Sequence, residues 1–260
     1  MKGKKLISVF LASVMLLCVV FSSVTATSAK TISVKPTKVT AISQTDITTL
    51  RISWSKVSGV NGYVLYYSTN GSRFKKLTTT KSRSYYHKKL KNGVKYYYKL
   101  KTYKKYKGKN KYSKYSNIKA KSCTNNLVNI YKPYRTRNYE LCTGLNKLMI
   151  SGKSYSNGFK LKTSVWDEKS FADYNLSGKY SSIKFTFGYL DDGYSGAEDT
   201  LYILSDNEEV ASYKLRAGDL ARTVKINIRR ASKLEFYVKN DIGSNVINEY
   251  IGFANISLYK

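Results

Sequence analysis

The stretch Tyr96-Tyr97-Tyr98-Lys99-Leu100-Lys101 decides the fold of the first half of the chain. In an extended strand its first, third and fifth residues face one side, and the other three face the opposite side. The runs Leu50–Trp54, Tyr63–Tyr67 and Tyr112–Lys121 also read as strands, and Asn70-Gly71 is a strong hairpin signal. About seven short strands and no helical period predict an all-β sandwich over residues 32–123.

The same segment resembles a fibronectin type III domain. Apolar and turn residues stand at the spacing of that family, including a tyrosine at the start of the sixth strand in the position of the tyrosine corner. The matching positions are Pro36, Trp54, Gly62, Tyr63, Leu90, Gly93 and Tyr96. The resemblance implies an immunoglobulin-like sandwich in which Trp54, Tyr63, Tyr96, Tyr98 and Leu100 form the core. Such domains act as spacers or adhesion modules.

Charge separates this segment from the rest of the chain. Residues 30–123 carry 24 Lys and Arg against one acid, Asp46, whereas residues 124–260 carry 19 against 15. A basic face with interleaved tyrosines favours an anionic partner, and its rings add stacking area for sugars or bases. The alternative is a solvated face that keeps the protein soluble. The predicted polyanion-binding residues are Tyr97, Lys99, Lys101, Lys104, Lys105, Lys107, Lys109, Lys111, Lys119 and Lys121.

The N-terminus has the pattern of a signal peptide. Three lysines precede an apolar stretch that runs from Leu6 to Phe21, and small residues follow up to Ala29. We therefore predict a leader over residues 1–29. An uncleaved anchor helix is the alternative, because Leu6–Val24 is long enough to span a bilayer. No later segment is hydrophobic enough to cross a membrane, so we expect no membrane span after cleavage.

Export narrows the choice of partner. The prediction is a secreted, extracellular bacterial protein, with attachment to the cell wall as one option. Teichoic acid, anionic mucin glycans or an acidic membrane surface then fit the basic face better than nucleic acid, which is not expected as a physiological partner. Two cysteines remain after cleavage, Cys123 and Cys142. They could form one disulfide bond or stay as two unpaired thiols.

The second half of the chain is also predicted to be all β. Residues 124–144 read as a linker that leads into a second fold over residues 145–260. Short runs with strand alternation follow, separated by loops rich in Gly, Asp, Asn and Ser. The candidate strands are Phe159–Val165, Ile183–Tyr189, Thr200–Ser205, Glu209–Leu215, Thr223–Ile228, Leu234–Lys239 and Ile251–Leu258. This succession predicts a jelly-roll-like sandwich.

An ordered set of motifs in this half resembles the NPCBM type of carbohydrate-binding module found beside glycosidases. Ser170–Tyr180 matches a Y-x-L-x-G-x-Y pattern, Phe185–Asp192 matches a strand that ends in Gly and Asp, and Leu201–Glu209 matches the next hairpin. Ala231–Phe236 matches a late strand, and Ile150–Phe159 resembles the start of the related module in clostridial surface proteins. The resemblance implies a β-sandwich that binds sugar.

One departure from the family limits what the resemblance implies about the site. The segment Glu249–Asn255 has neither the His nor the Trp that the family often carries near its end, so those sugar contacts cannot be carried over. A sugar site needs an aromatic platform with Asp, Asn or Arg beside it. The candidates are Trp166, Tyr189, Asp191, Asp192, Tyr194, Asn240, Asp241 and Asn245. Each loop taken alone is also compatible with an ordinary turn, and Trp166 with a core position.

Catalysis and metal binding have little support in the sequence. His87 is the only histidine, so a Ser–His or Cys–His pair is improbable, and no Cys/His cluster is present. No cofactor is predicted, although Ca²⁺ is an option on Asp191, Asp192, Glu198 and Asp199, whose spacing matches no defined calcium loop. The prediction is a non-catalytic, secreted carbohydrate-binding protein with a basic spacer. The alternative is a surface or matrix scaffold held by its basic face.

Overall fold

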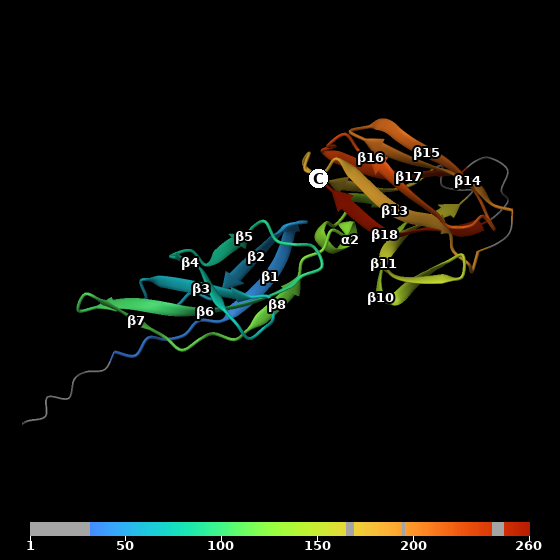
Figure 1. The fold of residues 1–260 in the computed structure, drawn as a ribbon. Coiled ribbons are helices and arrows are strands. Elements are labelled where there is room, and N and C mark those ends of the chain that lie inside the picture. Colours follow the sequence, from blue (N-terminus) through green and yellow to red (C-terminus); the bar gives the residue numbers. More distant parts are fainter. Residues whose placement is uncertain (1–31, 165–168, 194–195, 241–246) are drawn as a thin grey trace, which may run out of the picture. The chain divides into compact units, whose positions relative to one another are not determined.

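The computed structural model describes residues 32–164, 169–193, 196–240 and 247–260 (Figure 1). Nearly all regular structure in these residues is β, which confirms the predicted fold class. The one short helix, α2 (Leu127–Ile130), begins after Asn126, whose side chain accepts a hydrogen bond from the Val128 N–H. In the described part of the chain, no helix has the length and apolar character that a membrane span needs.

The first sandwich has two antiparallel sheets. One has the order β1 (Val39–Asp46), β2 (Thr49–Trp54), β5 (Ser84–His87). The other has the order β4 (Lys75–Thr80), β3 (Gly62–Ser68), β6 (Lys95–Tyr106), β7 (Lys109–Tyr112), and β8 (Lys119–Ser122) also pairs with β6.

The core of this sandwich follows the predicted alternation. Tyr96, Tyr98 and Leu100 are buried, while the residues between them are partly exposed. The Trp54 and Tyr63 rings pack 5.6 Å apart, centroid to centroid. The Tyr96 hydroxyl accepts a hydrogen bond from the Lys91 N–H at 3.0 Å, which is the interaction expected of a tyrosine corner.

The prediction of one strand over Tyr112–Lys121 is wrong. The structure has two strands there, because β7 pairs with the end of β6 and β8 with its beginning. Between them, two serine side chains replace a neighbouring strand as hydrogen-bond acceptors. The Leu100 N–H donates to Ser116 Oγ and the Thr102 N–H to Ser113 Oγ, each at 3.0 Å.

The second sandwich also has two antiparallel sheets. One has the order β10 (Tyr139–Ile150), β11 (Lys153–Ser164), β18 (Ile247–Tyr259), β13 (Ser182–Tyr189), β16 (Arg222–Asn227). The other has the order β15 (Glu208–Arg216), β14 (Glu198–Ser205), β17 (Lys233–Asn240), β12 (Lys169–Asn175), β9 (Arg135–Arg137). The residues 124–144, read as a linker from the sequence, contain α2, β9 and the first part of β10.

Aromatic residues from both sheets fill the space between them. The Phe159 and Phe253 rings stack with centroids 4.7 Å apart, and Phe236 meets both rings nearly edge-on. All three are fully buried. Burial of side chains of this size contributes about 1.5–3 kcal/mol each, so these three rings contribute substantially to the stability of the sandwich.

A smaller core lies beneath the β10–β11 hairpin, on the other face of its sheet. Leu148, Ile150 and Leu190 are buried there with Cys142. The hairpin packs closely because Gly188 and Gly252 lie opposite each other on β13 and β18. A Cβ on Gly252 would lie 2.8 Å from Leu190 Cδ2 and 2.9 Å from Ile150 Cδ1. The glycines therefore allow the hairpin turn to reach the end of β13.

Both cysteines are free thiols buried in separate cores. Cys123 lies in the core of the first sandwich and Cys142 in the small core of the second. Of the two alternatives that the sequence left open, the structure has the unpaired thiols. Burial raises the pKa of each thiol, so both stay protonated and poorly reactive.

Candidate functional site

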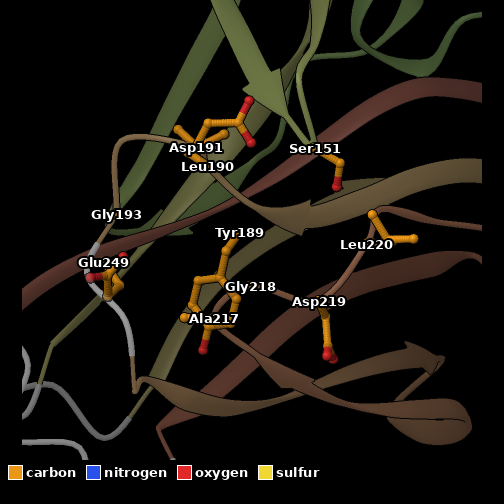
Figure 2. A pocket seen from close by; sticks show the side chains of 10 residues that line it. All are labelled: Ser151, Tyr189, Leu190, Asp191, Gly193, Ala217, Gly218, Asp219, Leu220 and Glu249. Atoms are coloured by element: carbon orange, nitrogen blue, oxygen red, sulfur yellow. The ribbon is translucent and has the colours of Figure 1, made fainter.

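A cavity of about 360 Å³ opens at one end of the second sandwich, where β13 and β15 end and β18 begins. Figure 2 shows the side chains that line it, which come from four segments distant in the sequence: the β10–β11 turn, the end of β13 with the loop after it, the β15–β16 connection and the start of β18. Three carboxylates line the cavity, from Asp191, Asp219 and Glu249. Carboxylate oxygens accept hydrogen bonds from hydroxyl groups, so this lining suits a ligand with several hydroxyls.

Tyr189 forms one wall and is fixed in place. It is 7% exposed, and its hydroxyl donates to Asp199 Oδ2 at 2.5 Å. Asp199 is itself buried and is the second residue of β14. The sequence proposed Tyr189 as a stacking platform, but its ring offers a ligand only a small contact area.

Asp191 joins the loop after β13 to the β10–β11 turn. Its Oδ2 accepts a hydrogen bond from the Gly152 N–H at 2.9 Å, and its own N–H donates to the Met149 carbonyl at 3.0 Å. Figure 2 shows its carboxylate turned away from the Tyr189 ring and toward Ser151, in the turn. One carboxylate oxygen therefore has a structural role, and the second stays available to a ligand in the cavity.

The cavity also contains residues that the sequence did not single out. Asp219 Oδ2 accepts from the Arg216 N–H at 3.2 Å and from Arg222 Nη2 at 2.8 Å. Ser151 Oγ accepts from the Ala221 N–H at 2.6 Å. Leu220 lines the same cavity and is 81% exposed. A large exposed apolar side chain at the rim of a polar cavity offers a contact for the apolar face of a ligand.

Glu249 lies at the back of the site, where β18 starts. It is buried, and a Cβ on Gly193 would touch its Oε2. Glycine at position 193 therefore allows the loop after β13 to pass close to this carboxylate. The sequence analysis named Glu249 only as part of the segment Glu249–Asn255, which lacks the His and Trp of the family, and expected no sugar contact there.

The structure brings together only part of the predicted sugar site. Tyr189 and Asp191 line the cavity, whereas Asp192 is exposed and is not part of the lining. Asn240 ends β17. Trp166, Tyr194, Asp241 and Asn245 lie outside the described residues, as does the predicted leader over 1–29.

The acids considered for Ca²⁺ do not converge. Glu198 forms an ion pair with Arg216 Nε at 2.8 Å, and Asp199 binds the Tyr189 hydroxyl. Across the described residues, no group of three His, Cys, Asp or Glu side chains is placed to hold a metal ion. The calcium hypothesis therefore gains no support from this end of the sandwich.

The predicted polyanion-binding residues lie on or beside β6, β7 and β8 of the first sandwich. Tyr97, Lys99 and Lys101 are on β6 and face away from the core, as the alternation predicted. Lys104 and Lys111 lie directly opposite each other across the β6–β7 pair. Like charges in that position destabilise a sheet, and Asp46 is the only acid in residues 32–123. An anion bound at this surface would relieve that repulsion.

Comparison with known families identifies both halves of the chain. The NPCBM/NEW2 domain matches residues 111–258, and the fibronectin type III domain matches residues 34–119. Both resemblances inferred from the sequence are thereby confirmed. No curated protein matches the chain significantly.

Solved structures with similar folds include several carbohydrate-binding modules. The M60 catalytic domain of Clostridium perfringens ZmpB with its CBM51-1 and CBM51-2 domains is 14% identical, with a TM-score of 0.43, covering 90% of this chain and 32% of that one. The CBM51-2 and INT domains of the same protein are 13% identical, with a TM-score of 0.40, covering 62% and 37%. A CBM28 module specific for non-crystalline cellulose is 15% identical, with a TM-score of 0.31, covering 47% and 87%. The chain thus spans only about a third of the length of the two ZmpB structures.

Proposed function

Because the chain belongs to the NPCBM/NEW2 domain family, we propose that it is a secreted, non-catalytic carbohydrate-binding protein. The sugar would be bound by the second sandwich, in the cavity beside Tyr189. The observation that carries this proposal is the convergence of three carboxylates, the Ser151 hydroxyl and the exposed Leu220 on one cavity of about 360 Å³. This volume is near the lower end of the usual range for ligand sites, which suits a single sugar unit or the end of a chain.

The lining matches the two chemical features of a sugar. Hydroxyl groups can donate to the oxygens of Asp191 and Asp219 that are not used within the protein. Leu220 can cover the apolar C–H face of the ring, a contact that the largely buried Tyr189 supplies only in part. Because the donors to both aspartates are already in place, the acceptors are oriented before a ligand arrives, which reduces the entropic cost of binding.

The absence of catalysis is part of the proposal. Both recognised domains are of non-catalytic kinds. His87, the only histidine of the chain, lies on β5 of the first sandwich with its Nδ1 2.9 Å from the Tyr98 hydroxyl. It is therefore committed to a core contact and not to a Ser–His or Cys–His pair.

We assign a second, electrostatic contact to the first sandwich. Its basic face on β6, β7 and β8 would bind anionic polymers of the cell wall or of a host surface. The high ratio of bases to acids and the lysine pair opposed across β6 and β7 support this role. The predicted leader supports an extracellular location, where such polymers are found.

A surface or matrix scaffold with no specific sugar site is the competing function. The small exposed area of Tyr189 favours it, because most sugar sites offer a free aromatic face. In that case the chain would attach only through its lysines, and salt would abolish binding.

A glycan array with neutral and anionic glycans, at low and high salt, separates the two functions. We expect the full chain to bind defined neutral glycans in a salt-resistant manner. Leu220→Arg should reduce that binding more than tenfold, since about 1.4 kcal/mol of lost contact is a factor of ten. Leu145→Arg is the matched control, because Leu145 is 99% exposed in the same sandwich and does not line the cavity. Binding to anionic glycans alone, removed by salt, would leave the scaffold.

A further inference from the structure

The outward face of β6 carries a cluster of lysine ammonium groups held against aromatic rings. Lys99 Nζ lies 4.0 Å from the ring centroids of both Phe74 and Tyr115. Lys101 Nζ lies 4.1 Å from the Tyr115 centroid. Tyr115 therefore contacts two ammonium groups, and these distances put their nitrogens within about 8 Å of each other. That separation is comparable to the Debye length at physiological salt, so the two charges act together on a bound anion.

The backbone fixes this cluster in place. Lys99 is paired with Tyr66 across β3 and β6, and the Tyr66 ring meets the Tyr115 ring edge-on at 5.4 Å. Tyr115 lies in the segment between β7 and β8, where Ser116 both donates to the Leu100 carbonyl at 2.8 Å and accepts from its N–H. Lys99, Lys101 and Tyr115 are thus positioned by a strand and by a segment bonded to that strand.

The cluster carries positive charge without a nearby carboxylate. The contacts with aromatic rings compensate each ammonium only weakly, by about 0.5–1 kcal/mol at exposed sites. No ion pair within the described residues involves Lys99 or Lys101. Burial and the neighbouring Tyr115, to which the Tyr66 hydroxyl is hydrogen-bonded, raise the pKa of Tyr66. Two cations on one rigid surface make a site that an anion can occupy.

The rings here position the lysines and do not stack on a ligand. An ammonium at 4.0 Å from a ring centroid occupies the face on which a base or a sugar would stack, and Lys99 does this for both Phe74 and Tyr115. The expectation that these tyrosines add stacking area therefore does not extend to Tyr115. Proteins that bind single-stranded nucleic acid depend on such free faces, so this surface favours recognition by charge alone.

We infer that Lys99 and Lys101, held around Tyr115, form a binding site for a sulfate or phosphate ester group of a polyanionic glycan. A tetrahedral ester directs its oxygens in several directions, so separate oxygens can accept from the two ammonium groups. A carboxylate has only two oxygens, both in one plane, and therefore offers fewer directions of approach to the two ammonium groups. The inference rests on the proposed function, since it names the site and the chemical group that the basic face would recognise.

Binding to the full chain can be measured with heparin, poly(glycerol phosphate) and the carboxylate polymer poly(glutamate), each compared at the same concentration of anionic groups. Lys99→Gln/Lys101→Gln should weaken binding to heparin or poly(glycerol phosphate) by about 10–30-fold and lower the slope of log K against log salt by about two. Lys81→Gln/Lys88→Gln removes the same charge from lysines without a ring contact, and we expect a loss of less than about threefold. Which ester polymer binds more tightly tells sulfate from phosphate.

A variant of unchanged charge gives the sharper test. Tyr115→Leu leaves every lysine in place but releases both ammonium groups, and Tyr115 is 43% exposed, so folding should not suffer. We expect about a fivefold loss of affinity for the ester polymers, because the lysines must then be ordered on binding. Equal loss in the two double variants together with full binding by Tyr115→Leu would overturn the site. Tighter binding of poly(glutamate) than of both ester polymers would also overturn it. If the unaltered chain bound none of these polymers, the basic face itself would lose its proposed function.

Discussion

The close approach of β11 and β18 predicts a large effect of a single methyl group at Gly158. Gly158 lies in β11, an interior strand of its sheet, opposite Cys142 on β10 and Ala254 on β18. A Cβ at this position would lie 2.8 Å from Leu148 Cδ1 and 3.0 Å from the Phe253 carbonyl carbon, and closer still to the Phe253 carbonyl oxygen. Carbon atoms normally approach to about 3.5–4.0 Å, so Gly158→Ala must push β18 away from β11.

The expected cost can be worked out from these contacts. Overpacking of this kind costs about 1–3 kcal/mol, and weakening one or two hydrogen bonds of the β11–β18 pair adds about 0.5–1.5 kcal/mol for each. Alanine also restricts the unfolded chain more than glycine does, and this stabilises the folded protein by about 0.4–1 kcal/mol. The mid-range values of these three contributions give a net loss of about 2–3 kcal/mol in the free energy of unfolding. For a sandwich of this size that lowers the melting temperature by about 10 °C.

Calorimetry of the full chain measures this shift, with the transition of the first sandwich as an internal reference. Gly144→Ala is the control in the same sandwich. It has a φ of +66° but no atom within 4 Å of a Cβ, so it should cost only the backbone strain of about 1–2 kcal/mol. If Gly158→Ala melted within about 2 °C of the unaltered chain, or above the control, β11 and β18 would not approach as described.

Three further predictions concern titratable groups. Burial lowers the pKa of His87, so below about pH 6.5 the unfolded chain takes up a proton that the folded chain excludes. The first sandwich should therefore lose stability as pH falls from 7 to 5. Urea unfolding of His87→Gln should show a smaller loss of stability over the same pH range. Arg135→Ala removes the partner that lies 2.7 Å from the buried Asp173 carboxylate and leaves Lys233 at 3.7 Å. Urea unfolding should then show a loss of about 1–2 kcal/mol in the free energy of unfolding. This loss is smaller than for a fully buried ion pair because Arg135 is largely exposed. Iodoacetamide should label neither Cys123 nor Cys142 in the native chain, because both thiols are buried. In denaturant without a reductant it should label both, as mass spectrometry would show. A disulfide bond would leave both unlabelled in denaturant.

The sequence was sufficient for the strands whose burial alternates. Tyr96–Lys101 and Ile183–Phe187 have one face in a core, so their apolar residues recur at every second position. β9 and β10 were not predicted as strands, because both are edge strands with few buried residues. β10 is also interrupted by a register shift between Thr143 and Leu148, which breaks the period of two.

The cavity was only partly predictable for a related reason. Tyr189 and Asp191 belong to one loop whose composition indicated a ligand site. Asp219, Leu220 and Ser151 lie in other connections, and only the pairing of β13 with β16 and β18 and of β10 with β11 brings them to the same end of the sandwich. No local sequence pattern indicates that Leu220 is exposed at a cavity rim or that Ser151 accepts a hydrogen bond from the distant Ala221 N–H.

The two proposed contacts differ in physical character, and this difference explains why one chain would carry both. A cavity with about one sugar unit of space gives specificity but little affinity, since a single sugar buries a small area. A surface with lysines held on aromatic rings gives rapid, salt-sensitive attachment that selects the anionic group and not the sugar. When both bind the same polymer, the second contact is intramolecular, and the overall affinity can exceed either one by a factor of about 10²–10⁴. The chain should therefore hold an anionic glycan with accessible sugar ends much more tightly than a neutral glycan or a plain polyanion. Weakening the ammonium site by Tyr115→Leu should reduce that advantage without changing how the cavity binds a neutral sugar.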